Sequence, residues 1–289
     1  MKIAVTAASG KLGTKIVKEL LKHFESKDII GLARNVEKAK ALELGIEILP
    51  GDYNDRQQLE QSLTNVDTIL LVSGMDAPDK RIKQHQNVIE AAKKNGVKKI
   101  VYTSVQGCES NNDFAPIVKS NRQTEKDIIN SGLAWVIARN GIYIEPDIEY
   151  IENYQKMGGI YNCGQNGKCG YTNRHELAFA YYNLLSNNKY NGKIYNLNGK
   201  PISQKELAGY LSRAFNIQLE YFPLSVEEYR LDRSKELGDF LGTVIAGIYQ
   251  GIKDGCYDNQ GDYLEVCGRE HQSWDNYFEN LTKKTRESN

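Results

Sequence analysis

The sequence predicts an α/β protein, a Rossmann-like doubly wound parallel sheet with a smaller C-terminal α/β lobe. Three observations support this fold class. Short apolar runs alternate with amphipathic stretches over the first 140 residues, a glycine-containing segment separates the first run from the first stretch, and the alternation stops after Asn140. Strands separated by helices of 10–15 residues form βαβ units, which build parallel sheets with helices on both faces.

The alternating part of the chain contains six predicted strands and five predicted helices. In the first helix, Leu12, Ile16, Leu20 and Phe24 recur every four residues, the spacing of one helix face. The predicted strands are 3–7, 28–33, 46–49, 68–72, 99–103 and 134–138, and the predicted helices are 12–24, 36–44, 55–63, 81–94 and 118–130.

The second half is organised differently, because residues 143–171 are rich in Tyr, Gly and Asn and contain only a weak helical pattern at 149–157. Further helices are predicted at 174–185, 203–215, 225–251 (broken) and 272–281, and strands at 194–197 and 218–222. We therefore predict a Rossmann domain and a substrate-binding lobe that closes over it. The domain comprises residues 1–142 with roughly 172–198, and the lobe comprises 143–171 and 199–289.

Composition excludes several classes of protein. Lys and Arg number 37 and Asp and Glu number 37, so no net charge attracts nucleic acid or anionic lipid. The N-terminal apolar run spans about six residues, shorter than a secretion signal requires, and no window approaches a membrane span. We therefore expect a cytoplasmic protein that binds neither nucleic acid nor membranes.

The cysteines and histidines predict neither disulfides nor a metal site. The five cysteines form no C-x-x-C pair and their number is odd, so we expect reduced structural thiols. The four histidines lack the spacing of metal ligands.

The segment between the first strand and the first helix predicts a dinucleotide site. Gly10 lets a diphosphate approach the main chain, and Gly13 lets the helix pack closely on the strand. An ordinary strand-to-helix turn is the rival interpretation, but the position at the start of a βαβ unit favours phosphate binding. The residues assigned here to cofactor binding are Thr6, Ser9, Gly10, Lys11, Leu12 and Gly13.

The end of the second strand indicates which dinucleotide binds. An NAD site presents Asp or Glu here to the ribose hydroxyls, whereas this chain presents Arg34, which can hold the 2′-phosphate of NADP. Lys11 would assist from the adjacent loop. Asp52 and Tyr53 follow the third strand, where adenine is expected, and Ser73 and Ser104 at the ends of the next two strands complete the predicted NADPH site.

Several segments in order resemble the NmrA-like atypical short-chain dehydrogenases, and among them the bacterial NAD(P)H:quinone oxidoreductase type 2 branch. The opening T-A-A-S-G-K-L-G resembles the family's T-G-A-T-G-x-L-G. Ala7 replaces the first glycine, which leaves a strained turn, and Asn121 stands where this branch carries His. The further matching segments are 33–39, 51–55, 98–104, 123–128, 138–143 and 195–207.

The acid–base pair of ordinary short-chain dehydrogenases is missing from its expected helix. Those enzymes use Tyr-x-x-x-Lys after the fifth strand, and this chain has Asn121 and Glu125 at that spacing. Tyr249 and Lys253 fit the spacing but lie in the C-terminal lobe. A sugar-epimerase activity is disfavoured because it requires the phenol. Candidates for the active-site region are Ser104, Asn121 and Tyr143.

Two functions remain open. The first is an NADPH-dependent reductase that transfers hydride directly to a quinone or similar small electrophile, and the second is a non-catalytic NADP-sensing regulator of the NmrA-like type. A homodimer or a regulatory protein partner is compatible with either. Five tyrosines would form an aromatic wall for a flat acceptor or, alternatively, cover the surface: Tyr143, Tyr150, Tyr154, Tyr161 and Tyr171.

Overall fold

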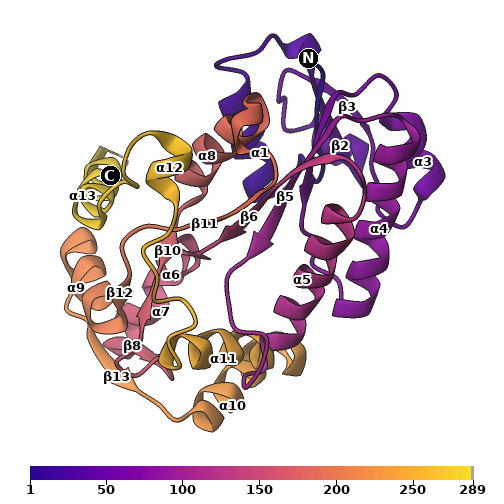
Figure 1. Cartoon of the computed structure of the whole chain (residues 1–289). Helices are drawn as coiled ribbons and strands as arrows, with labels where there is room; N and C mark the ends of the chain where they lie inside the picture. The colour runs from indigo at the N-terminus through magenta and orange to yellow at the C-terminus, as the bar shows by residue number, and fades with distance from the viewer. Residues whose placement is uncertain (288–289) are drawn as a thin grey trace.

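A computed structural model describes residues 1–287, with side chains to residue 283, and its centre is a seven-stranded parallel sheet (Figure 1). The strand order is β11-β6-β5-β4-β1-β2-β3. The order reverses direction between β4 and β1, because β2 and β3 lie on one side of β1 and β4, β5 and β6 on the other. The strands are β1 (Ile3–Val5), β2 (Ile29–Ala33), β3 (Glu47–Pro50), β4 (Thr68–Val72), β5 (Lys99–Val105), β6 (Ala134–Asn140) and β11 (Lys193–Leu197).

Helices cover both faces of the sheet, as the alternating pattern predicts. Helices α1 (Lys11–Leu20) and α8 (Arg174–Ser186) pack on one face. The other face is covered by α3 (Arg56–Ser62), α4 (Pro78–Lys94) and α5 (Ala115–Ile129), and the short α2 (Val36–Lys40) follows β2. The doubly wound fold class is thereby confirmed.

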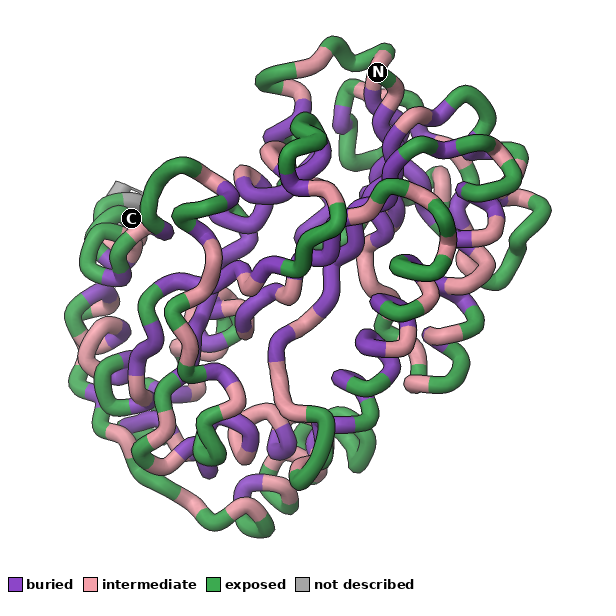
Figure 2. Tube along the Cα trace, viewed as in Figure 1, coloured by how far each residue is buried: buried purple, intermediate pink, exposed green. Residues whose placement is uncertain are grey.

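Burial on both faces explains why the strands read as continuous apolar runs. In β1, Ile3 and Val5 belong to the core cluster beneath α1 and α8, whereas Ala4 belongs to the cluster beneath α3, α4 and α5. Successive side chains point to opposite faces of a strand, so every position must be apolar. Figure 2 shows the resulting band of buried residues through the sheet.

Most of the remaining elements form a lobe with its own apolar core, which contains Ile144, Tyr171, Leu211 and Trp274. Helix α12 (Tyr263–Cys267) instead contributes Tyr263 and Val266 to the core beneath α1 and α8. Three two-stranded sheets lie in the lobe, pairing β7 with β10, β9 with β12, and β8 with β13. The strands are β7 (Ile142–Tyr143), β8 (Gly159–Asn162), β9 (Lys168–Cys169), β10 (Tyr171–Thr172), β12 (Ile202–Ser203) and β13 (Glu220–Pro223). The helices are α6 (Glu145–Glu149), α7 (Ile151–Met157), α9 (Gln204–Phe215), α10 (Val226–Leu237), α11 (Asp239–Lys253), α12 (Tyr263–Cys267) and α13 (Trp274–Glu287).

Several predicted boundaries were wrong for identifiable reasons. Strands β5 and β6 each continue two residues past the predicted ends, because Ser104 pairs in register with Arg139 and Val105 with Asn140. The apolar pattern ends at the polar residues Ser104, Arg139 and Asn140. The side chains of Ser104 and Arg139 donate to Glu125, and Asn140 accepts from Tyr181. Helix α4 begins at Pro78, three residues early, since proline fits the first helical turn. The predicted break in 225–251 falls at Gly238, whose φ is +83°.

The expectation of reduced thiols was wrong for two of the five cysteines. Cys108, in the loop after β5, forms a disulfide with Cys256 after α11, across 148 residues of sequence. No spacing rule connects residues so far apart, and the fold alone brings them together. Cys163, Cys169 and Cys267 are free thiols.

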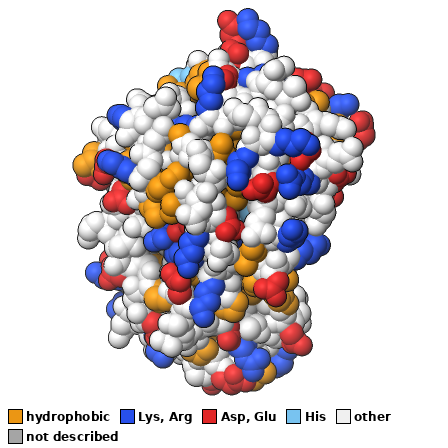
Figure 3. Space-filling view, turned by 45° about the vertical axis from the view of Figure 1, so that its right-hand side comes forward, with side chains coloured by type: hydrophobic (Ala, Val, Ile, Leu, Met, Phe, Trp, Pro, Cys, Tyr) orange, Lys and Arg blue, Asp and Glu red, His pale blue; other side chains and the backbone are white. Residues whose placement is uncertain are grey.

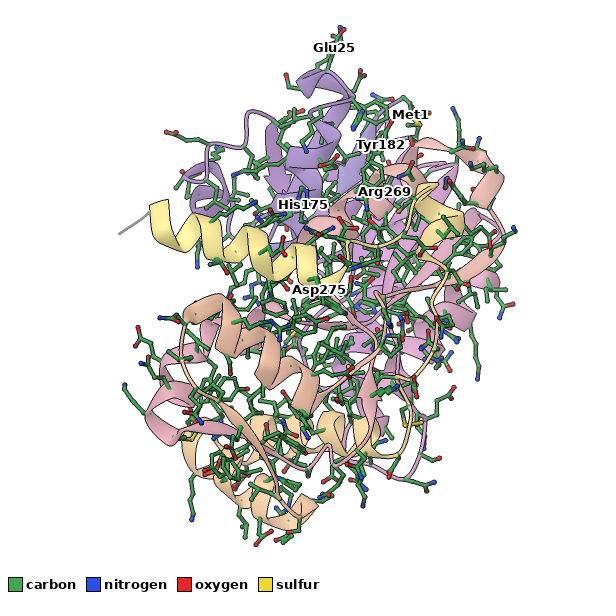
Figure 4. All side chains as sticks on the ribbon, turned by 90° about the vertical axis from the view of Figure 1, so that its left-hand side faces the viewer. Met1, Glu25, His175, Tyr182, Arg269 and Asp275 are labelled. Carbon is green, nitrogen blue, oxygen red and sulfur yellow. A yellow bond between two sulfur atoms is a disulfide. The ribbon has the colours of Figure 1, made fainter. Side chains whose placement is uncertain are left out.

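The segment at residues 262–272 contacts helix α8 of the Rossmann part. Arg269, labelled in Figure 4, donates from Nη1 and Nη2 to the carboxylate of Glu176 on α8, at 2.7 and 3.0 Å. The Arg269 guanidinium also lies 4.8 Å from the centre of the Phe179 ring. Residues 262–272 therefore pack against α8 as well as against the lobe.

The surface carries no large region of one charge on the face drawn in Figure 3, where basic and acidic side chains are interspersed. Among the described residues, none of the helices is long and apolar enough to cross a bilayer.

Candidate functional site

The predicted cofactor residues gather at one edge of the sheet. The segments after β1, β2, β3 and β4 all leave at the carboxyl ends of parallel strands, and they carry Ser9, Arg34, Tyr53 and Ser73 respectively. The reversal of strand order between β1 and β4 opens a crevice at this edge, which is where open α/β sheets bind ligands.

The loop from β1 to α1 is held close to the helix. Ala7 adopts a left-handed φ of +47°, which bears out the strain expected from replacing the family glycine. A Cβ added to Gly13 would lie 2.3 Å from the carbonyl oxygen of Ala7, so only glycine fits there. At Gly10 the same oxygen would be 3.2 Å away, so that position is tight but less restrictive.

The first turn of α1 offers unpaired amides. Gly10 is the N-cap and, having no side chain, it cannot cap the helix, and no acidic residue occupies the first turn. Within the described structure, no acceptor bonds the amides of Lys11, Leu12 and Gly13. These amides and the helix dipole form the environment that binds a phosphate.

Arg34 follows the end of β2 and is exposed, with no ion pair or hydrogen bond to the described part of the chain. Side-chain hydrogen bonds, chiefly from Gln84, lower the pKa of Asp76, and the charge of Arg34 contributes to this shift at longer range. A guanidinium left free at this position can accept a 2′-phosphate without first breaking an internal contact. No carboxylate immediately follows β2, since Asn35 caps α2 through its side chain.

Thr6 and Tyr53 form a network beneath the loop. The Tyr53 hydroxyl donates to the carbonyl of Val72 at 2.8 Å and shares a short hydrogen bond with Thr6 Oγ1, which accepts from the Val72 amide at 2.9 Å. Burial raises the pKa of Tyr53, so the phenol stays protonated. Thr6 is fully buried, and its side chain therefore fixes β1 against β4 rather than facing the crevice.

Asp52 and Ser73 are also engaged by neighbours. The Asp52 carboxylate accepts from the backbone and side-chain nitrogens of Asn54, both at 2.9 Å, which shapes the turn after β3. The Ser73 amide donates to Thr103 Oγ1 at 2.8 Å, and its hydroxyl donates to Asn121 Oδ1 at 3.1 Å. Both residues remain half-buried at the edge of the crevice.

A buried histidine that the sequence did not indicate fixes the loop after β4. His85 Nε2 accepts from the Gly74 amide at 2.9 Å, and His85 Nδ1 lies 2.9 Å from Thr124 Oγ1. Burial and the charge of Arg81 lower the pKa of His85 to about 3, so the ring is neutral. Because Nε2 accepts, Nδ1 carries the proton and donates to Thr124. His85 thus orients the peptide that follows Ser73.

Asn121 occupies the position of the family phenol, but a phenol from another element reaches it. The hydroxyl of Tyr102 on β5 donates to Asn121 Oδ1 at 2.6 Å, beside the Ser73 contact. Both Tyr102 and Asn121 are buried, at 0% and 1% exposure. The sequence pattern does not indicate Tyr102, because the family's phenol is expected on the helix and Tyr102 lies on the strand beside it.

Ser104 and Glu125 form a second buried network next to this one. Glu125 accepts from Ser104 Oγ at 2.6 Å, from Arg122 Nη1 at 2.8 Å, and from Arg139 through Nε and Nη2 at 2.9 and 2.6 Å. Burial alone would raise the pKa of Glu125, but the hydrogen bonds from Arg139 and Ser104 and the nearby guanidinium charges lower it. Glu125 is therefore ionised, and Ser104 serves as one of its donors.

The third active-site candidate, Tyr143, makes no hydrogen bond to Ser104 or Asn121 in the described structure and instead contacts Asn140 at the end of β6. Its hydroxyl accepts from Asn140 Nδ2 at 3.3 Å, and the Arg174 guanidinium lies 5.2 Å from its ring centre. Lys11, which was assigned to the phosphate loop, donates to both carboxylate oxygens of Glu149 on α6, at 2.7 and 2.8 Å.

The aromatic wall predicted from five tyrosines is only partly available. Tyr154 and Tyr171 are 8% and 0% exposed and belong to the core of the lobe, so that part of the expectation was wrong. Tyr143, Tyr150 and Tyr161 are half-buried. The buried hydroxyls of Tyr154 and Tyr171 have polar partners, since Tyr154 donates to Asp147 and Tyr171 accepts from Gln204.

One such partner is Asp147, which is buried in the lobe. Its Oδ1 accepts from Tyr154 at 2.7 Å and from Tyr249 at 3.3 Å. Burial raises the pKa of Asp147 to about 6, although the two phenols act in the opposite direction. Tyr249, which matched the Tyr-x-x-x-Lys spacing, is thus part of this internal contact.

The raised pKa predicts a pH-dependent stability difference for Asp147→Asn. A carboxyl whose pKa is higher in the folded state loses stability as pH rises through that pKa. We expect the variant to be more stable than wild type by on the order of 2–3 kcal/mol at pH 8, with the difference shrinking as the pH falls and vanishing below the ordinary carboxyl pKa of 3.8. Urea unfolding across this range measures it. A difference that does not change with pH would contradict the burial of an ionisable group here.

Together these features define a nucleotide-binding Rossmann protein. The cradle that a Cβ would fill at Gly13, the unpaired amides of α1 and the free Arg34 fit the diphosphate and 2′-phosphate of NADPH. Within the described residues, no group of three or more His, Cys, Asp or Glu side chains could hold a metal ion.

Comparison with known proteins also indicates a nucleotide-binding Rossmann protein. The chain belongs to the NAD(P)H-binding, NmrA-like family of oxidoreductases. A family model described as NAD(P)H-binding matches residues 7–187. Quinone oxidoreductase 2 of Escherichia coli (strain K12) is 31% identical over 272 residues, covering 92% of this chain and 93% of that protein. An NAD(P)H azoreductase of Xenophilus azovorans is 24% identical over 229 residues, covering 78% of each.

Two solved structures are similar over nearly the whole chain. The Citrobacter sp. triphenylmethane reductase complexed with NADP(H) has a TM-score of 0.89 and 29% identity, covering 97% of this chain and 100% of that one. The E. coli NADPH-dependent quinone oxidoreductase QOR2 complexed with NADPH has a TM-score of 0.89 and 28% identity, covering 96% and 99%.

Proposed function

We propose that this protein is an NADPH-dependent reductase that transfers hydride to a quinone or a similar small, flat electrophile. The observation that carries the proposal is the crevice edge itself, where a glycine cradle, uncapped amides and a free guanidinium converge. The relatives named for quinone, azo and triphenylmethane reduction support an electrophilic acceptor conjugated over several atoms.

The bound cofactor supplies a hydride, and the residues of this chain supply orientation. Arg34 and the amides of Lys11 and Leu12 would hold the two phosphate-bearing parts of the cofactor, while His85 and Ser73 fix the loop after β4 beside it. Positioning the donor against the acceptor removes most of the entropic cost of a bimolecular reaction. The hydride carries two electrons and one proton to the quinone, and water supplies the second proton of the hydroquinone.

The proposed chemistry proceeds without a phenol–ammonium pair. Asn121 and Glu125 stand at the pair's spacing, and both are buried and fully engaged by Tyr102, Ser104 and Arg139. A reduced quinone oxygen is basic enough to take its proton from solvent, so the reaction does not demand a precisely placed acid. The same buried arrangement also fits the second hypothesis, a protein that binds NADP without turnover.

A turnover assay separates the two hypotheses. Purified protein is mixed with NADPH and a panel of benzoquinones and naphthoquinones, and the loss of reduced nicotinamide absorbance is followed, with each acceptor also tested without protein. We expect acceptor-dependent oxidation of NADPH. Tight binding of NADPH with no oxidation across the panel would favour the sensor.

The free guanidinium after β2 predicts the cofactor preference. Arg34→Asp removes a charge-assisted phosphate contact worth about 1.5–3 kcal/mol, so NADPH affinity should fall by about tenfold or more. NADH lacks the 2′-phosphate, and its affinity should not fall. Calorimetric titration of both nucleotides measures the effect, with Arg213→Asp, an exposed arginine on α9, as the matched control. Equal binding of both nucleotides by the variant and wild type would remove this role from Arg34.

A further inference from the structure

Two helices begin side by side at the predicted diphosphate site. Helices α1 and α8 pack together on one face of the sheet. Helix α1 follows β1, and α8 leads into β11, so both helices begin at the edge where the parallel strands end. Lys11 is the first residue of α1, and Arg174 is the first residue of α8, next to His175, which Figure 4 labels. Each helix start adds partial positive charge to the cation it carries.

The short helix α6 supplies a carboxylate to each of these starts. Glu145 Oε1 accepts from the Arg174 amide at 2.7 Å. Glu149 Oε1 lies 2.7 Å from Lys11 Nζ and 3.7 Å from Arg174 Nη1, so a single anionic oxygen is shared by both cations. The sequence separation between Lys11 and Glu149 is 138 residues, and the contact joins the phosphate loop to the lobe.

Arg174 is poorly satisfied by this arrangement. The residue is 9% exposed, yet its guanidinium makes no hydrogen bond to any described residue, and its nearest carboxylate oxygens, on Glu145 and Glu149, are both 3.7 Å away. Asn173, the preceding residue, has a buried Nδ2 with no partner in the described structure. Glu145 Oε2, which lies beside the Arg174 guanidinium, is also buried without a hydrogen bond in the described structure. Among the described residues, the Arg174 guanidinium is thus held by two long ion pairs and by no short hydrogen bond, which leaves it able to bind a stronger anion.

The Glu149–Lys11 pair is, in contrast, easy to displace. The side chains of Lys11 and Glu149 are 66% and 53% exposed, and ion pairs so exposed to water contribute little to stability. A diphosphate carries more charge than a carboxylate and also engages the amides of α1, so it would bind these cations in preference.

We propose that Arg174 is a ligand of the cofactor diphosphate and that Glu149 is an internal anion that holds Lys11 and Arg174 until the diphosphate replaces it. Cofactor binding then breaks one contact between α6 and the phosphate loop. Glu149 lowers the affinity for NADPH, because it competes with the diphosphate for Lys11 and Arg174. When the cofactor binds, the contact of Glu149 with Lys11 is lost, and the contact of Glu145 with the Arg174 amide is kept.

Titrations of NADPH and of adenosine 2′-monophosphate, which lacks the diphosphate, test the displacement. We expect Glu149→Gln to bind NADPH about three- to fivefold more tightly than wild type and adenosine 2′-monophosphate equally well. The matched control is Glu152→Gln, an exposed glutamate on α7, for which neither affinity changes. Lys11→Met should abolish most of the gain from Glu149→Gln, since the cation for which the anions compete is gone.

Three outcomes of the glutamate substitutions would overturn the displacement by the diphosphate. The first is unchanged or weaker NADPH binding by Glu149→Gln. The second is an equal gain in affinity for NADPH and adenosine 2′-monophosphate, which would indicate only a general charge effect. The third is an equal gain in NADPH affinity from Glu152→Gln. Arg174→Gln provides the second readout, and we expect weaker NADPH binding with adenosine 2′-monophosphate unchanged. If a correctly folded Arg174→Gln protein binds NADPH as wild type does, Arg174 is not a diphosphate ligand. Should that variant not fold, the Glu149→Gln comparison still decides the competition.

Discussion

Gly13→Ala is expected to reduce NADPH affinity by about ten- to a hundredfold. The added Cβ would lie 2.3 Å from the Ala7 carbonyl oxygen and 3.0 Å from the Ala8 Cα, both main-chain atoms that cannot rotate away. Relief requires α1 to move off β1, and such overpacking typically costs about 1–3 kcal/mol. Because the binding amides belong to α1, the strain falls on the cofactor site. Calorimetric titration of NADPH measures the loss.

A glycine with space around it provides the control. Gly209 lies within α9, and the nearest neighbour of an added Cβ is the flexible end of Arg213 at 3.6 Å. Gly209→Ala should bind NADPH as wild type does and gain up to about 1 kcal/mol of stability, since alanine favours the helix. Wild-type affinity in Gly13→Ala would show that this loop does not hold the cofactor.

The second large effect is expected on stability. Glu125→Ala removes the carboxylate that, among the described residues, alone pairs with Arg139, and it leaves Arg122 with the more distant, exposed Glu109. Both guanidiniums would remain partly or largely buried without their main counterion, and breaking such a pair costs about 3–5 kcal/mol. Urea unfolding at pH 7 measures the change. Ser104 would also lose the acceptor of its hydroxyl.

Glu109→Ala is the matched control for this prediction. Glu109 is 58% exposed and lies 3.5 Å from Arg122 Nε, so its removal should change stability by no more than about 1 kcal/mol. Similar effects of Glu125→Ala and Glu109→Ala would contradict a buried network centred on Glu125.

The sheet and the phosphate loop could be predicted from sequence because they follow from local patterns. Alternation of apolar runs with helical periods identifies βαβ units, and the position of Gly10 and Gly13 relative to the first strand needs no tertiary information. The ends of β5 and β6 could not be predicted, because the register pairs Ser104–Arg139 and Val105–Asn140 continue the ladder although three of these four residues are polar.

The rest of the site depends on contacts between distant residues. Tyr102 reaches Asn121 from a neighbouring strand, His85 reaches Gly74 from α4, and Cys108 meets Cys256 across 148 residues. No period or spacing encodes these pairs. The tyrosine wall illustrates the same limit, since composition predicts many tyrosines but cannot say that Tyr154 and Tyr171 face the lobe interior.

Crystals soaked with NADPH test the central claim most directly. We expect the diphosphate oxygens to accept hydrogen bonds from the amides at the start of α1 and the 2′-phosphate to contact Arg34. A cofactor bound elsewhere on the chain, with these amides and this guanidinium left to solvent, would contradict the account.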